Sequence, residues 1–570
     1  MKRWIAQAAV VVVAGCAAAP THESLDYVTR SKTGEGPTTE ELVNDQRSPD
    51  DVLTYGMGYS QQRYSPLAQI NKSNVKRLVP VWSLALQNEF GEQAQPMIYD
   101  GVMYVADAKW TVAVDAATGN TIWRTPTDFV PETPRVVCCG VSNKGVALYR
   151  GKVFRTTLDA FVVALDQKTG KVLWKEKAAE WKDGYSQTVA PQIANGVVIT
   201  GISGAEFGIR GFLDGWDPDT GKHLWRLYTT PGPGEKGHDT WEPREAYKTG
   251  GASTWITGSY DPELDLVYWG TGNAGPWNPV NRKGDNLYAA SILALRPKTG
   301  EVVWHYQVVP NDVFDWDSLW ELILADIPID GQMRKVVMQM NRSGFLYVLD
   351  RTNCKLIAAH ALVKVNWASH VDLATGRPVL TDVYKRFLDG EEVEIYPSRG
   401  TNAVPIAFNP NTGLIFASTW NLPRIQKLVM TPAPQVLGGN TTGVTSRLPE
   451  VKPGDAYGHF VAINPVTGQK KWEVPLTDFP SSAGMLATAG GLVFTGKLTG
   501  DFIALDEDTG KTLWQFKTGS SINSTAITYT YKGKQYVTIA SGLGGGLANR
   551  YAQEKVPTGG SIWTFALMPQ

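Results

Sequence analysis

This chain has few cysteines and no excess of either charge. Its 570 residues contain four cysteines, with 54 Lys plus Arg against 55 Asp plus Glu. None of the cysteines lies in a Cys-x-x-Cys-His motif, which excludes a covalently attached c-type haem. The balanced charge gives no reason to expect a nucleic acid or an acidic polymer as a partner, and we predict none.

Beyond its first residues, the chain also lacks an apolar run long enough to span a bilayer. Residues 1–4 are basic, residues 5–14 are apolar, and small residues follow. This pattern predicts a signal peptide over residues 1–19, too short for a spanning helix, and therefore export to the periplasm. Residues 13–16 also match a lipoprotein box, with cleavage before Cys16 and a lipid on that cysteine, so two cleavage sites are possible.

The mature chain is expected to have two parts. Residues 20–50 are polar and charged, and we interpret them as a loose N-terminal arm. Residues 51–570 are rich in Trp, Tyr and Gly, with 20, 22 and 57 of these in the whole chain. Such a composition favours short strands and tight turns over helices, so we predict a single all-β domain there. The sequence leaves open whether it is a monomer or a homodimer.

One phrase recurs along this domain: apolar residues followed by Asp, two variable residues, Thr-Gly, a short gap and then Trp. Its clear copies end at Trp123, Trp174, Trp225, Trp304, Trp472 and Trp514. Each copy predicts a β-hairpin in which Gly supplies a positive φ. Counting degenerate copies and a strand near residues 79–82, we predict an eight-bladed β-propeller with Trp packed between neighbouring sheets. Residues 231–247 and 363–401 should be long loops on one face.

Two adjacent cysteines, Cys138 and Cys139, form an unusual pair. A disulfide stabilises mainly by closing a long loop in the unfolded chain, and a bond between neighbours closes almost none. If the two are bonded, the bond therefore serves local shape, as a small rigid ring whose flat face suits a planar ligand. Two free, buried thiols are the alternative at this point.

The stretch at residues 138–145 and several later motifs resemble the pyrroloquinoline quinone (PQQ) alcohol dehydrogenases, the family of methanol and ethanol quinoprotein dehydrogenases. The resemblance extends from about Asp51 to the C-terminus. It implies a Cys138–Cys139 disulfide on one face of the quinone and Trp255 on the other. The other residues at cofactor-binding positions are Lys144, Thr188, Ser203, Gly204, Ala205, Ser253, Arg342 and Asn421. The glycine run at residues 542–546 resembles a turn over the same site.

The same resemblance implies a metal ion beside the quinone. Glu206 and Asn273 match its oxygen ligands, and Asp315 matches the catalytic carboxylate, also a ligand. Asp317 stands where lanthanide-dependent relatives carry Asp and calcium-dependent ones usually have a small neutral residue. On an extended segment the two aspartates would point the same way. We therefore expect one Ca²⁺ or lanthanide ion, with the lanthanide favoured. In the alternative, Asp317 turns toward Arg or solvent and the site binds calcium.

The family's reaction is the oxidation of an alcohol to an aldehyde or ketone. Asp315 would act as general base while hydride passes to metal-bound PQQ, and the electrons would leave to an external acceptor such as cytochrome c. Two residues depart from the family pattern. Gln93 stands where relatives often carry Glu, and Ser482 where they often carry Trp. The smaller Ser482 predicts a wider pocket mouth, open to bulky or secondary alcohols.

A non-catalytic β-propeller, such as an outer-membrane assembly lipoprotein, is the alternative from another class. It would share the Trp-bearing repeat and the Gly15-Cys16 signal. A scaffold gives no reason for Cys138-Cys139, Glu206, Asn273 and Asp315 to occur in one chain. The sequence therefore favours the enzyme.

Overall fold

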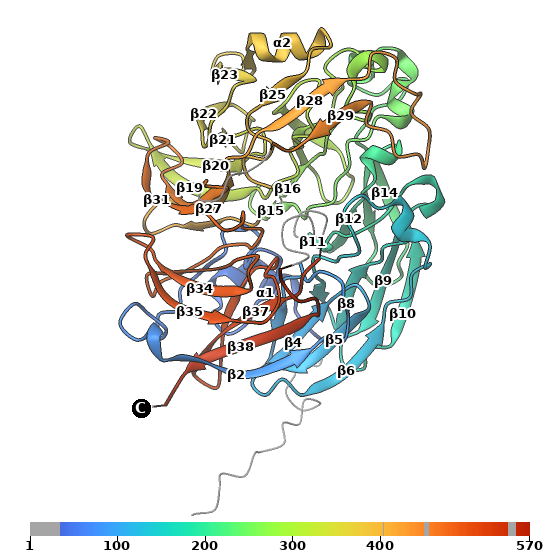
Figure 1. The fold of residues 1–570 in the computed structure, drawn as a ribbon. Coiled ribbons are helices and arrows are strands. Elements are labelled where there is room, and N and C mark those ends of the chain that lie inside the picture. The colour runs from blue at the N-terminus through green and yellow to red at the C-terminus, as the bar shows by residue number, and fades with distance from the viewer. Residues whose placement is uncertain (1–34, 403, 450–454, 545–554, 570) are drawn as a thin grey trace, which may run out of the picture.

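The computed structural model describes residues 35–402, 404–449, 455–544 and 555–569. The predicted signal peptide and Cys16 lie outside these ranges. Within them the chain forms eight sheets of four or five strands and two smaller sheets (Figure 1). None of the helices in the described ranges is long and apolar enough to cross a membrane. The all-β prediction is confirmed.

Four sheets follow one another directly along the chain, each a meander of four strands. Their strands are β3 (Met97–Tyr99), β4 (Val102–Ala106), β5 (Trp110–Asp115) and β6 (Thr121–Pro126); β7 (Ala147–Tyr149), β8 (Lys152–Thr156), β9 (Phe161–Asp166) and β10 (Val172–Lys177); β11 (Gln192–Ala194), β12 (Val197–Gly201), β13 (Phe212–Trp216) and β14 (His223–Tyr228); β15 (Ser259–Asp261), β16 (Leu266–Gly270), β17 (Ser291–Leu295) and β18 (Val302–Gln307).

Of the other four large sheets, the first is again a meander of consecutive strands, and the remaining three include strands that are distant in sequence. Their strands are β19 (Ile323–Ile329), β20 (Gln332–Met340), β21 (Phe345–Asp350) and β22 (Leu356–Ala361); β26 (Ala407–Asn409), β27 (Leu414–Trp420), β30 (Gly458–Ile463) and β31 (Lys470–Leu476); β1 (Tyr64–Ser65), β32 (Leu486–Thr488), β33 (Leu492–Gly496), β34 (Asp501–Asp506) and β35 (Thr512–Lys517); β2 (Leu78–Ala85), β36 (Ile527–Tyr531), β37 (Lys534–Ser541) and β38 (Ser561–Leu567).

Burial differs between the inner and outer strands of a sheet. Strands β12 and β13, the second and third of their sheet, are buried at every residue. By contrast, β10, the outermost strand of the preceding sheet, is exposed at all residues but one. Strands buried on both faces read as continuous apolar runs, while outer strands need apolar residues on one face only. The core therefore lies between neighbouring sheets.

The tryptophan repeat joins each sheet to the next. Each Trp lies on the outermost strand of its sheet and donates its indole N–H to a backbone carbonyl in a turn of the next sheet. The pairs are Trp82–Ala116 (3.2 Å), Trp123–Gln167 (3.1 Å), Trp174–Pro218 (3.2 Å), Trp225–Pro297 (2.9 Å), Trp304–Arg351 (3.2 Å) and Trp472–Glu507 (2.8 Å). The predicted packing of Trp between sheets is confirmed.

The series returns to its starting sheet. Trp514 donates to the carbonyl of Leu78, 3.0 Å away, in the sheet that also holds Trp82. That sheet pairs β2 from near the N-terminus with β38 from near the C-terminus, and Figure 1 shows blue β2 beside red β38. Strand pairing between the two ends of the chain thus closes the series of sheets.

At one junction a histidine replaces the tryptophan. His360 on β22 lies 2.8 Å from the carbonyl of Val466, and its ring lies against the Cα of Gly468. Gly468 has a φ of +70°, and a Cβ there would meet the imidazole at 2.5 Å. The glycine of the repeat is therefore required both for the turn and for the approach of the ring.

Residues 363–401, predicted to be a loop, contain regular elements instead, and further ones follow up to residue 449. They include a hairpin, a helix and a small sheet, which gather at the top edge of Figure 1. These elements are β23 (Ala368–Val371), β24 (Pro378–Leu380), α2 (Asp382–Leu388), β25 (Val393–Ile395), β28 (Arg424–Leu428) and β29 (Val444–Arg447). The predicted loop at 231–247 holds the 3₁₀ helix η7 (His238–Thr240) and part of η8 (Arg244–Thr249).

The described part of the N-terminal arm, residues 35–50, is not loose. It forms helix α1 (Thr39–Asn44), which Thr38 and Glu41 close with a capping box, and the short 3₁₀ helix η2 (Asp45–Arg47). Leu42 is 1% exposed, and the Asp45 carboxylate accepts the N–H groups of Leu53 and Thr54 at 2.8 and 2.9 Å. The prediction of a loose arm is therefore wrong from residue 35 onward.

Candidate active site

A cavity of about 500 Å³ collects most of the residues singled out in the sequence. The predicted residues in its wall are Cys138, Cys139, Lys144, Thr188, Ser203, Gly204, Glu206, Ser253, Trp255, Asn273, Asp315, Asp317 and Arg342. The two residues that depart from the family pattern, Gln93 and Ser482, also line it. Residues from many parts of the chain therefore meet in one space.

A tight turn after β12 presents Glu206. Gly204 has a φ of +130°, and a Cβ there would meet the carbonyl oxygen of Gly184 at 2.1 Å, so only glycine fits. The short 3₁₀ helix η6 (Ala205–Phe207) follows. Glu206 accepts the indole N–H of Trp277 at 3.3 Å. The turn thus fixes a half-buried carboxylate at the cavity wall.

The loop between β18 and β19 presents the aspartates and is organised by Asp312. Asp312 is 1% exposed and accepts three backbone N–H groups, from Phe314 (3.0 Å), Trp316 (2.8 Å) and Asp317 (3.0 Å). Asp315 and Asp317 have φ values of +60° and +56°. The expectation of an extended segment is wrong, because Asp312 holds this loop in a turn with left-handed residues.

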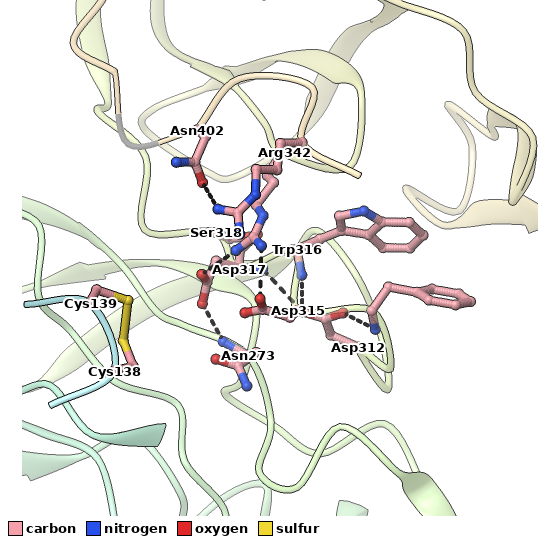
Figure 2. A network of polar contacts seen from close by, with 12 residues as sticks. Cys138, Cys139, Asn273, Asp312, Asp315, Trp316, Asp317, Ser318, Arg342 and Asn402 are labelled. Atoms are coloured by element: carbon pink, nitrogen blue, oxygen red, sulfur yellow. Dashed lines mark hydrogen bonds and ion pairs between the residues drawn. A yellow bond between two sulfur atoms is a disulfide. The ribbon is translucent and has the colours of Figure 1, made fainter. Parts of the chain in front are cut away.

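Although the segment is not extended, Arg342 contacts both aspartates (Figure 2). Its Nη2 lies 2.8 Å from Oδ2 of Asp315, and its Nη1 lies 3.4 Å from Oδ2 of Asp317. Asp317 also accepts the backbone N–H of Asn273 at 2.6 Å. Asp317 thus turns toward an arginine, as one of the two predictions had it, while still lining the cavity.

Negative charge accumulates at this end of the cavity. Burial, and next the charge of Asp315, raise the pKa of Glu206 to about 7. The same two causes, in the same order, raise the pKa of Asp317 well above its ordinary value, although Arg342 opposes them. Carboxylates that repel one another in a buried place favour a cation nearby.

The donors predicted for a metal ion share the cavity wall but are not gathered around one point. Within the described ranges, no three His, Cys, Asp or Glu side chains are close enough to hold a metal ion. Instead, Arg342 carries the positive charge between Asp315 and Asp317. The set nevertheless has the chemistry that a hard cation requires, with carboxylate and amide oxygens and uncompensated negative charge.

A positive side chain lies elsewhere in the wall. Lys144 is 7% exposed, and burial lowers the pKa of its ammonium to about 7. Its Nζ lies 3.3 Å from the hydroxyl of Thr188 and 4.8 Å from the centre of the Trp255 ring. No carboxylate is among these contacts, so Lys144 is suited to an anionic ligand.

Cys138 and Cys139 are joined by a disulfide. The pair follows the 3₁₀ helix η4 (Thr133–Val136), and both residues are exposed where they line the cavity. The alternative of two free, buried thiols is wrong. Figure 2 shows the disulfide near the cluster that contains Asn273 and Asp317.

Two predicted residues do not line the cavity. Ala205 is buried behind Gly204, and Asn421 lies at the end of β27, where its backbone N–H donates to Tyr457. Asn402 lines the cavity instead and accepts a hydrogen bond from Arg399, 2.9 Å away. The predicted glycine turn at residues 542–546 is described only as far as Gly544, which does line the cavity.

Sequence reasoning also missed Tyr55 and Arg282. Tyr55 lines the cavity, and the buried Arg63 lies over its ring at 4.7 Å. Arg282 is fully buried and donates to the carbonyl of Asp312, which supports the aspartate loop. An arginine 30 residues from an acidic loop gives no periodic signal, so only the folded chain reveals it.

Comparison with known proteins agrees with this geometry. Residues 53–366 and 390–537 match the PQQ family described as "Glucose/ethanol/alcohol dehydrogenase, beta-propeller domain". The chain belongs to the PQQ-dependent alcohol dehydrogenase family. It is therefore an enzyme of this class, and the alternative of a non-catalytic scaffold is not supported.

Its relatives in this family cover most of the chain. The quinohemoprotein alcohol dehydrogenase ADH IIB of Pseudomonas putida is 42% identical over 86% of this chain and 73% of its own length. The quinoprotein alcohol dehydrogenase PedH, also of Pseudomonas putida, is 38% identical over 94% of each chain. Among solved structures, a europium-containing methanol dehydrogenase superposes with a TM-score of 0.88, at 34% identity, over 93% of this chain and all of that one.

Proposed function

We propose that this protein oxidises an alcohol to an aldehyde or ketone in the cavity, with PQQ as cofactor and Asp315 as general base. The observation that carries the proposal is the position of Asp315, in the wall of the cavity lined by the Cys138–Cys139 disulfide and held by Arg342 at 2.8 Å. A carboxylate there can reach a small molecule and keeps one oxygen fixed.

The residues present fit PQQ. Several buried polar atoms in the cavity wall have no partner among the described residues: Ser203 Oγ, Arg342 Nε, Ser482 Oγ and Asn523 Oδ1. Burial of such atoms is costly unless a ligand satisfies them. Together with the ammonium of Lys144, the donors among them suit a ligand that carries carboxylate and carbonyl oxygens. Trp255 and the disulfide offer two flat surfaces to a planar ring.

Asp315 would accept the hydroxyl proton of the alcohol, with Arg342 holding its other oxygen. When bound, PQQ supplies the redox chemistry by accepting the hydride that leaves the alcohol carbon. Oδ2 of Asp315 is occupied by Arg342, and within the described part of the chain no donor bonds to Oδ1. Oδ1 is then the oxygen that takes the hydroxyl proton of the alcohol.

A metal ion would bind beside the cofactor through Glu206, Asn273, Asp315 and Asp317. The europium in the related methanol dehydrogenase favours a lanthanide over Ca²⁺. The third carboxylate favours it too, because Asp317 still lines the cavity although it contacts Arg342. The raised pKa values of Glu206 and Asp317 support a site that gains stability from added positive charge.

The remaining parts of the proposal concern the molecule as a whole. The eight large sheets are the blades of one eight-bladed ring, which the series of Trp contacts and the β2–β38 pairing support. The N-terminal signal would export the protein to the periplasm, with or without a lipid on Cys16, and electrons would leave to an external carrier such as cytochrome c. Ser482 in the cavity wall supports a pocket open to bulky or secondary alcohols.

Asp315→Asn tests the proposal. Because the amide cannot take the proton while the disulfide and Trp255 remain, we expect PQQ to bind and turnover to fall by about 10²- to 10⁴-fold. The measurements are the quinone absorbance of the reconstituted protein and alcohol-dependent reduction of a phenazine-linked dye. Near-normal dye reduction in this variant would mean that another group is the base.

A further inference from the structure

A second arginine lies behind the catalytic carboxylate. Arg424 is the first residue of β28, in the small sheet built from the 363–449 segment. Its Nη1 lies 4.0 Å from Oδ2 of Asp315, the same oxygen that Arg342 contacts at 2.8 Å. Arg424 is 6% exposed and does not line the cavity. Arg424 therefore reaches the site through Asp315 and not by lining the cavity.

The surroundings of Arg424 connect it to both sides of the site. Nη1 lies 3.4 Å from the carbonyl of Phe314, the residue before Asp315. The guanidinium lies 5.5 Å from the ring centre of Trp277, and Trp277 in turn donates to Glu206. One side chain thus contacts the backbone and the carboxylate of the aspartate loop, and also the aromatic ring that holds Glu206.

The charges around Asp315 indicate a role for Arg424. Arg342 is shared between Asp315 and Asp317, so a single positive charge faces two carboxylates. A buried carboxylate without a full counter-charge is costly and poorly held. Arg424 supplies a second positive charge, 4.0 Å from Oδ2 of Asp315. Two guanidiniums at Oδ2 leave Oδ1 as the oxygen that faces a substrate.

We propose that Arg424 is a positioning residue for Asp315, fixing Oδ2 between two guanidiniums so that Oδ1 is directed at the alcohol. This proposal rests on the proposed role of Asp315 as the base. It assigns a catalytic task to the small sheet of β25, β28 and β29, because β28 carries Arg424.

The chain offers a matched control on the same strand. Gln426 lies two residues after Arg424 on the same face of β28, is 1% exposed, and has no side-chain partner among the described residues. The test compares Arg424→Met, Arg424→Lys and Gln426→Met in the PQQ- and metal-loaded enzyme. Methionine keeps most of the volume of the stem and removes the charge, whereas lysine keeps the charge.

We expect Arg424→Met to lower kcat by about 10- to 100-fold, because a small misplacement of a reacting group is that costly. KM for the alcohol and the quinone absorbance should change little, since Arg424 contacts neither ligand. Arg424→Lys should recover most of kcat, and Gln426→Met should match wild type. A wild-type kcat in Arg424→Met, an equal loss in Gln426→Met, or a loss in Arg424→Lys as large as in Arg424→Met would each overturn the proposal.

Asp315→Asn separates the two proposals. If Asp315→Asn is active, the assignment of the base is wrong, whatever Arg424 does. If Asp315→Asn is inactive while Arg424→Met has a normal kcat, only the role of Arg424 is refuted. Should Arg424→Met lack the quinone absorbance, Arg424→Gln takes its place in the comparison: a reduced kcat with normal KM that Arg424→Lys recovers supports positioning, and a wild-type kcat in Arg424→Gln refutes it.

Discussion

Lys144 should make the stability of the cofactor-free protein rise with pH. Burial lowers the pKa of its ammonium from 10.5 to about 7 in the folded state. Between those two values the unfolded chain binds more protons than the folded chain, so the free energy of unfolding increases with pH. Each pH unit in this range adds about 1.4 kcal/mol at most to the free energy of unfolding, so the total increase has an upper limit of about 5 kcal/mol. The contacts with Thr188 and Trp255 favour the charged form and reduce that figure.

The perturbation is Lys144→Met, which keeps the volume and removes the charge. Below about pH 7 the variant should be more stable than wild type, because it has no buried ammonium to desolvate. The difference should shrink as the pH rises toward about 10, and urea unfolding of both proteins across this range measures it. Lys168→Met, at an exposed position, is the control and should follow wild type.

Cofactor binding should show the opposite dependence. The carboxylates of PQQ beside Lys144 would restore its pKa, so binding takes up a proton above about pH 7, and affinity falls by up to about tenfold per pH unit there. In Lys144→Met, affinity should be low and independent of pH over this range. Equal pH dependence of unfolding and of PQQ affinity in wild type and Lys144→Met would refute the reasoning.

Two further predictions concern the disulfide and the metal ion. Cys138→Ala should weaken the quinone absorbance and dye reduction but barely change the melting temperature of the cofactor-free protein, because a bond between neighbours closes no loop; a large loss of melting temperature would show the pair to be structural. Metal-stripped wild type should regain more activity with La³⁺ than with Ca²⁺, and Asp317→Ala should lose that preference, since it removes a carboxylate suited to a trivalent ion. Equal or better activity with Ca²⁺ in both proteins contradicts the lanthanide assignment.

The fold was largely predictable because its signal is local and repeated. An Asp-x-x-Thr-Gly turn followed by Trp specifies a hairpin within about ten residues, and each Trp docks on the next copy of the turn. His360 escaped detection because it keeps the position and the hydrogen bond of the tryptophan without its residue type. The N-terminal arm was misjudged because one buried Leu42 and a capping box stabilise it through tertiary contact, which composition does not record.

The site was predictable where a glycine-bounded turn presents one functional side chain. Glu206 and Asn273 follow short strands and small residues, so their place in the sequence fixes their place in the fold. Asp315 and Asp317 line the expected cavity, but on a turn rather than on the extended segment that we predicted. Asp312 accepts three N–H groups and turns the loop, and a polar cap of that kind cannot be told in sequence from a solvated aspartate.

Asn421 shows where sequence reasoning stops. The backbone N–H of Trp420 donates to the carbonyl of Gly400 at 2.8 Å, so the segments that carry Asn402 and Asn421 run close together. Only Asn402 lines the cavity, because the direction of each side chain depends on the pairing of the two segments rather than on the local sequence. The same dependence hides Arg424, since β28 is brought to Asp315 by the folding of the whole 363–449 segment. Residues that act through a neighbour thus become visible only when all the charges around that neighbour are counted in the folded chain.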